Sequence, residues 1–107
     1  MARILVNSKV FTETVRSAIH VNSSSIEIKD GYIVFSETVK LSVERVGSYN
    51  KATHYRSNVT KKYLEDVVSF MQQIDEQPIV IEFTEYMHTD IHESPEMNIL
   101  SITKRFK

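Results

Sequence analysis

The fold is decided by the stretch KVFTETVRSAIH, residues 9–20, and by its counterpart KKYLEDVVSFMQQI, residues 61–74. In both stretches apolar residues recur every three or four positions, which is typical of a helix that covers a sheet. The two patterns lie 53 residues apart, so that Phe11 corresponds to Leu64 and Ala18 to Met71. A strand-like run precedes each pattern and several follow it. A fixed offset between core-facing positions predicts two copies of one strand–helix–strands unit in a single domain.

The first copy begins with a short apolar strand at residues 2–6. Asn7 or Ser8 then caps the helix, because either side chain can accept a hydrogen bond from an unpaired N–H group of the first turn. The polar face of this helix carries Lys9, Arg16 and His20. Its buried stripe is expected to hold five apolar side chains, Val10, Phe11, Val15, Ala18 and Ile19.

Between Ile26 and Phe35 the apolar residues alternate with polar ones, and Asp30-Gly31 stands at the centre. An Asp-Gly pair tolerates the positive φ angles of a two-residue type I′ hairpin turn. The turn fixes the register, which pairs Lys29 with Tyr32, Ile28 with Ile33 and Ile26 with Phe35. The same alternation predicts another half-buried strand over residues 39–44.

In the second copy, Thr60 is expected to cap the helix, and Val59 and Leu64 stand at the positions of a hydrophobic staple. Strands are predicted near residues 53–57, from Ile79 onward, over residues 86–92 and over residues 98–106. The summed order is βαβββ twice. We therefore expect one α+β domain over residues 1–107, with half-units of about 1–52 and 53–107 and both helices packed on one face of an antiparallel sheet.

Composition narrows the functional class. The chain has 107 residues, of which 41% are hydrophobic and 25% charged, and these are globular values that exclude disorder. No run approaches the roughly 18 apolar residues of a membrane span, and the first residues lack the apolar stretch of an export signal. We expect a cytoplasmic protein without a membrane partner. The absence of cysteine excludes disulfides, thiolate zinc sites and cysteine nucleophiles.

Catalytic and metal motifs are weak. Two glycines leave little room for a nucleophile elbow or a phosphate-binding loop, so we expect no enzyme and no cofactor. His88, Asp90 and His92 would share one face of a strand, as a metal trio could, but their acidic surroundings favour an exposed polar segment and no metal is predicted. The segment 45–56 carries cations with Tyr49 and Tyr55, a composition that suits either a base-stacking surface or a polar loop.

The order of elements resembles one domain of the DNA sliding clamps, the ring-shaped processivity factors whose domains repeat a βαβββ unit twice. The resemblance spans nearly the whole chain. It rests on the strand at residues 3–6, the helix at 8–19, the hairpin around Asp30-Gly31, the helix start at 60–64 and the strand at 78–83.

This resemblance implies a non-enzymatic accessory module of DNA replication. Clamp domains join edge to edge into rings whose helices present lysine and arginine to DNA, which gives salt-sensitive binding without sequence preference. The implied partners are further copies of this chain through its sheet edges, duplex DNA and a replication protein. The residues that correspond to the DNA-facing positions are Lys9, Arg16, His20, Lys61 and Lys62.

The charge balance keeps an alternative open. The formal net charge is −1, and Glu13, Glu65 and Asp66 stand among the candidate basic residues. Mixed charge is the ordinary state of an exposed helix face. The alternative is a protein-binding adaptor or inhibitor of the same fold that does not contact DNA, and an enzyme ranks third.

Overall fold

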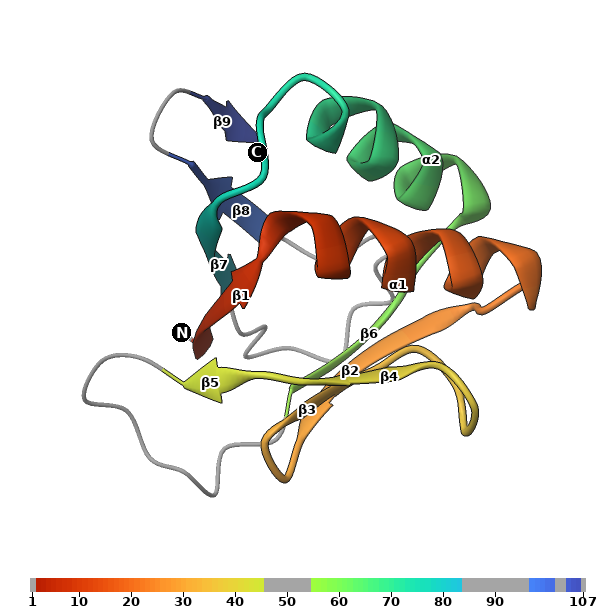
Figure 1. Ribbon diagram of the computed structural model, residues 1–107. Helices are drawn as coiled ribbons and strands as arrows, with labels where there is room; N and C mark the ends of the chain where they lie inside the picture. Colours follow the sequence, from red (N-terminus) through yellow and green to blue (C-terminus); the bar gives the residue numbers. More distant parts are fainter. Residues whose placement is uncertain (1, 46–54, 84–96, 102–103, 107) are drawn as a thin grey trace.

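The computed structural model describes residues 2–45, 55–83, 97–101 and 104–106, which form a mixed α+β fold (Figure 1). The first half of the chain contains β1 (Ala2–Asn7), α1 (Ser8–His20), β2 (Ser25–Lys29), β3 (Tyr32–Val34), β4 (Lys40–Ser42) and β5 (Glu44–Arg45). The second half contains β6 (Tyr55–Asn58), α2 (Lys61–Met71), β7 (Pro78–Phe83), β8 (Met97–Leu100) and β9 (Arg105–Phe106).

The described strands form two antiparallel sheets, of which one has the order β5-β1-β7-β8-β9 and the other the order β4-β3-β2-β6. Each half of the chain lends its first strand to the sheet of the other half. β1 pairs with β7 over six residue pairs, and β6 pairs with β2 over four. The two halves are therefore interlocked through their sheets.

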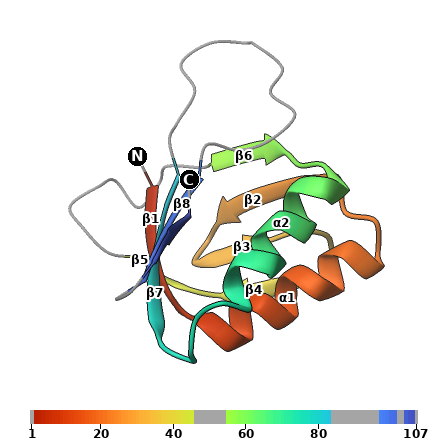
Figure 2. The same ribbon diagram turned by 90° about the horizontal axis from the view of Figure 1, so that it is seen from above.

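Both helices begin at the predicted caps, which lie 53 residues apart. The Asn7 side-chain oxygen accepts hydrogen bonds from the backbone N–H groups of Lys9 and Val10, at 3.0 and 3.2 Å. The Thr60 hydroxyl accepts one from the Tyr63 N–H group at 3.1 Å. The two helices run antiparallel, side by side, over the inner faces of the sheets (Figures 1 and 2).

The predicted hairpin is confirmed. β2 and β3 pair Lys29 with Tyr32 and Ile28 with Ile33. Asp30 and Gly31 both have positive φ angles, 52° and 80°, as the turn requires. The predicted pair of Ile26 with Phe35 lies beyond the ladder, because β3 ends at Val34 and the Phe35 N–H group bonds to the carbonyl of Val39.

The expectation of a single sheet is wrong, and so is that of one continuous strand over residues 39–44. β4 ends at Ser42, and the Val43 N–H group donates to the Gly31 carbonyl at 2.9 Å. The chain then crosses to the other sheet, where β5 pairs with β1. The predicted strand is divided because its first part pairs with β3 of the hairpin and its last part pairs with the free edge of β1.

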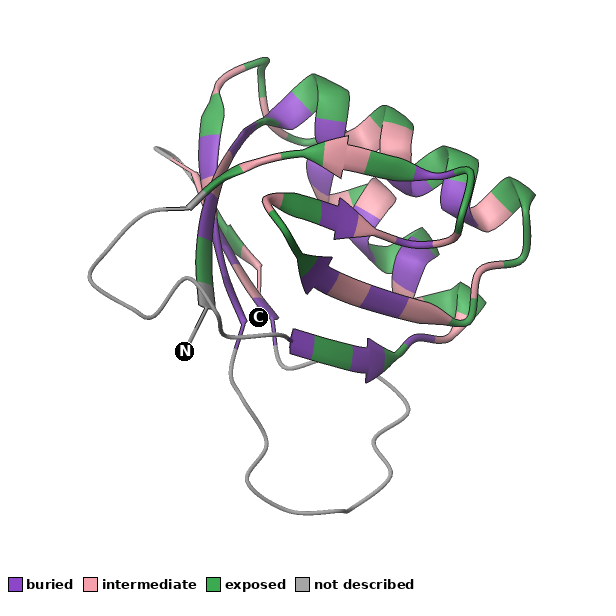
Figure 3. Cartoon of the chain, turned by 90° about the horizontal axis from the view of Figure 1, so that it is seen from below, coloured by how far each residue is buried: buried purple, intermediate pink, exposed green. Residues whose placement is uncertain are grey.

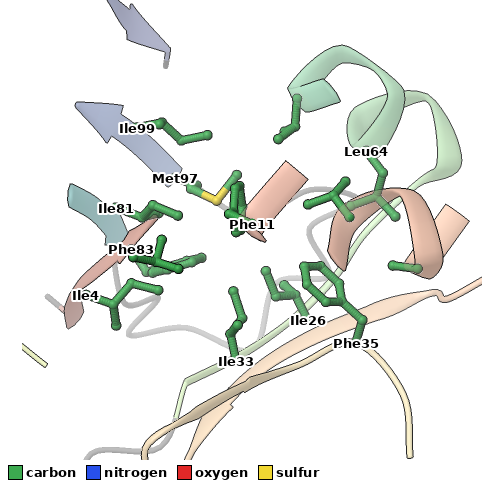
Figure 4. Packing of buried hydrophobic residues seen from close by; sticks show 14 of the residues in the cluster. Ile4, Phe11, Ile26, Ile33, Phe35, Leu64, Ile81, Phe83, Met97 and Ile99 are labelled. Atoms are coloured by element: carbon green, nitrogen blue, oxygen red, sulfur yellow. The ribbon is translucent and has the colours of Figure 1, made fainter. Parts of the chain in front are cut away.

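The core lies between the two sheets and the helix pair. The five-stranded sheet contributes isoleucines such as Ile4, Ile81 and Ile99, none of which is exposed to solvent. Figure 4 shows side chains from both sheets and both helices converging on this core, with Phe11 and Leu64 entering from the helices. Strand β6 alternates between buried and exposed residues along its length, as Figure 3 shows.

Two details of the predicted helices are wrong. Val10, which was expected in the buried stripe, is 43% exposed, whereas Ser8 is buried. The stripe runs through Phe11, Val15 and Ala18, and Val10 lies about 100° away from Phe11 around the helix. The second helix ends at Met71, three residues before the end of its apolar pattern at Ile74.

The last described strand covers α2. The ring of Phe106 lies 6.1 Å from that of Tyr63 and 5.4 Å from that of Phe70, measured between ring centroids. The Lys104 ammonium group also donates to the Gln73 side-chain oxygen at 2.9 Å. β9 thereby connects the second helix to the edge of the five-stranded sheet.

Candidate nucleic-acid interface

All five residues that the resemblance assigns to DNA lie exposed on the helices. Because the helices are antiparallel, the start of α1 lies beside the end of α2. Lys9 lies at that end, and Arg16 lies just past the middle of α1, seven residues further on. At the opposite end, His20 is the last residue of α1, and Lys61 and Lys62 are the first two residues of α2. The five cations are thus spread along the helix pair, with Lys9 at one end, Arg16 between the ends, and His20, Lys61 and Lys62 at the other end.

An open pocket of about 240 Å³ lies between α1 and the end of α2 with the residues that follow it. Met71 and Ile74 form its apolar side, and the charged residues around it include both cations and carboxylates. Its lining among the described residues is Ser8, Lys9, Thr12, Glu13, Arg16, Met71, Ile74 and Glu76. The structure therefore brings Lys9 and Arg16 together around one hollow, with two carboxylates beside them.

Ser8 fixes the shape of this pocket. Its backbone N–H group donates to the Gln77 carbonyl at 2.8 Å, and its hydroxyl accepts from the Gln77 N–H group at 2.9 Å. These bonds attach the start of α1 to the segment between α2 and β7, which carries Ile74 and Glu76. The sequence pattern did not reveal this role, because the two partners lie 69 residues apart.

The lysines of α2 are already paired with acids of their own helix. The Lys61 ammonium group lies 4.0 Å from a carboxylate oxygen of Glu65, and that of Lys62 lies 3.5 Å from one of Asp66. Exposed pairs at this spacing contribute roughly 0.3–0.5 kcal/mol. They reduce the positive potential at this end of the helices, although a phosphate can displace such weak partners.

Tyr55 is part of the core, which corrects its interpretation as a base-stacking side chain. It is 3% exposed, and its ring lies 5.1 Å from that of Phe83. Its neighbour Arg56 is exposed. The rest of that candidate segment, residues 46–54, lies outside the described residues.

The predicted strand over residues 86–92, with its His88, Asp90 and His92, also lies outside the described part of the chain. Within that part, the structure contains no cluster of three histidine, aspartate or glutamate side chains that could hold a metal ion. Neither α1 nor α2 is long and apolar enough to cross a membrane.

Comparisons with known proteins identify no relative. No family model, curated protein or solved structure matches the chain.

Proposed function

We propose that this chain is a non-enzymatic, clamp-like accessory module that associates with duplex DNA through its helix pair. The observation that carries the proposal is the antiparallel helix pair, on which all five candidate cations are exposed. The two interlocked halves support it, since each begins with a strand and a helix and continues with antiparallel strands, which is the order of elements on which the sliding-clamp resemblance rests.

The arrangement of charge favours weak contact that does not depend on sequence. α1 has 13 residues and is about 20 Å long, so its two ends can reach phosphates several base pairs apart. Lys9 supplies charge at one end, Arg16 near the middle, and His20, Lys61 and Lys62 at the other end. The carboxylates among them lower the affinity, which suits a contact that must move along DNA.

Association of copies through sheet edges belongs to the same proposal. Among the described strands, β5 and β9 are the edge strands of the larger sheet. Each has only two residues, so each offers few backbone N–H and C=O groups to a neighbouring copy. β4 and β6, with three and four residues, end the smaller sheet and provide the longer free edges. We expect edge-to-edge contacts there.

A protein-binding adaptor or inhibitor is the second candidate. The mixed charge of the pocket and its apolar side at Met71 and Ile74 suit a polypeptide segment better than a phosphate backbone. The ion pairs of Lys61 and Lys62 point the same way, because they weaken the attraction for DNA.

Fluorescence anisotropy with a labelled duplex of random sequence tests the two candidates. For a DNA-associated module we expect binding at low salt that weakens steeply as salt rises, with a log–log slope of about −0.9 for each phosphate contact. Replacing Lys9 and Arg16 by glutamine should reduce the steepness of that slope by the equivalent of one to two phosphate contacts. The same double change at Lys29 and Lys40, on the smaller sheet, removes equal charge and should leave the slope nearly unchanged. No binding at low salt would favour the adaptor.

A further inference from the structure

The outer face of the five-stranded sheet carries a row of residues that crosses every strand. The pairing register aligns Leu5 with Val80 and Val80 with Leu100. At the two ends, Glu44 pairs with Leu5 and Arg105 with Leu100. The neighbouring row, Ile4, Ile81, Ile99 and Phe106, fills the inner face. In strand order the outward row therefore reads Glu44, Leu5, Val80, Leu100, Arg105.

The middle of this outward row is apolar and partly exposed. Leu5, Val80 and Leu100 are intermediate in burial and lie outside the hydrophobic core cluster. Among the described elements, no helix or strand lies over this face, since both helices pack on the inner side (Figures 1 and 2). Glu44 and Arg105 are exposed at the two ends and carry opposite charges.

We propose that a second copy of this chain docks on the outer face of the five-stranded sheet, related to the first by a two-fold axis along β7. β7 is the middle strand of the five, so such an axis reverses the outward row. Leu5 of one copy then faces Leu100 of the other, and Val80 faces its own equivalent. Glu44 of each copy then faces Arg105 of the other, so that the interface contains two equivalent pairs of opposite charge.

The next outward-facing row, two residues before Leu5 along β1, is compatible with this contact. It contains Arg3, Glu82 and Asn98, which are cross-strand partners. The axis places Glu82 opposite its own equivalent, although this residue is only 8% exposed in each copy. The repulsion between the two carboxylates is reduced, because the Arg3 guanidinium donates to the Glu82 carboxylate at 2.7 Å within each sheet.

The size of the face predicts a weak dimer. Five strands spaced about 4.8 Å apart are about 19 Å wide, and six residues of β1 or β7 are about 20 Å long. The area of about 400 Å² lies below the roughly 800 Å² that each partner buries in a standard interface. Association is thus expected only at high protein concentration. It uses a surface distinct from the free edges of β4 and β6.

Analytical ultracentrifugation over a wide concentration range tests the proposal, with the full chain and without DNA. The expected result is a monomer–dimer equilibrium. E44R alone and R105E alone should each weaken dimerisation by about tenfold, because each change places like charges opposite one another at both ends. The double variant E44R/R105E restores opposite charges and should return the affinity to within about threefold of the original.

Two further variants complete the test. Val80→Asp, on the axis, should abolish the dimer, whereas E37R in the exposed segment before β4 should leave it unchanged; circular dichroism confirms that each variant folds. A monomer at every concentration would overturn the proposal. Failure of the double variant to restore the dimer would overturn it as well. So would larger assemblies whose affinity is unaffected by either charge change, and these would place the contact at the sheet edges or elsewhere.

Discussion

At the scale of single residues, Ser8 is the clearest link between distant parts of the chain. It is 3% exposed, and its hydroxyl accepts from the Gln77 N–H group. Ser8→Ala removes this buried acceptor and leaves the Gln77 N–H group without it. We expect the free energy of unfolding, measured in urea, to fall by about 1–2 kcal/mol. Ser17→Ala is the matched control. Its hydroxyl is exposed and bonds only within α1 to the Glu13 carbonyl, so its cost should stay below about 0.5 kcal/mol.

Gly31 is required for its backbone conformation alone. Its φ angle is 80°, and an added Cβ atom would meet nothing within 4 Å. Gly31→Ala should therefore cost about 1–2 kcal/mol through backbone strain, with the fold unchanged. Thermal unfolding measures this loss, and Glu37→Ala in the nearby exposed segment serves as the control. An alanine variant as stable as the original would show that the turn can change its type.

Residues whose role is local could be read from the sequence. Asn7, Thr60 and Asp30-Gly31 act on neighbours within three positions, and the structure confirms each of them. Ser8 and Tyr55 could not be assigned in this way, because their surroundings come from segments far away in the chain. The repeated spacing of the core positions predicted the helices, whereas the partners of those helices depended on the tertiary fold.

At the scale of elements, the contact of β9 with α2 depends on one aromatic side chain. Phe106 lies between Tyr63 and Phe70 at the edge of the sheet. Phe106→Ala should destabilise the protein by about 1–3 kcal/mol, because it removes half-buried apolar area and two ring contacts. Amide hydrogen exchange should show a larger loss of protection in α2 than in α1. Phe106→Leu keeps most of the apolar volume and should lose less than half as much; equal losses in both helices would contradict this role.

The path of the chain after β4 marks the limit of element prediction. Alternation of apolar and polar residues over 39–44 indicated a strand correctly but could not say with which strand each part pairs. Lys40–Ser42 joins β3, whereas Glu44–Arg45 joins β1, and both pieces show the same period of two. Pairing partners are set by free edges elsewhere in the fold, and a single sequence does not encode these locally.

At the scale of the whole molecule, the exchange of first strands makes the two halves depend on each other. β1 finds its partner β7 in the second half, and β6 finds its partner β2 in the first. We expect the separate fragments 1–52 and 53–107 to show no cooperative thermal transition, since each lacks a strand of its main sheet and most of the surface that covers its helix. An equimolar mixture should recover helical circular dichroism and a transition whose midpoint rises with concentration, because association replaces a covalent link. The uncleaved chain is the control. A fragment that melts cooperatively alone would mean that each half closes its own core, and the interlocked sheets would then contribute little to the stability of the whole.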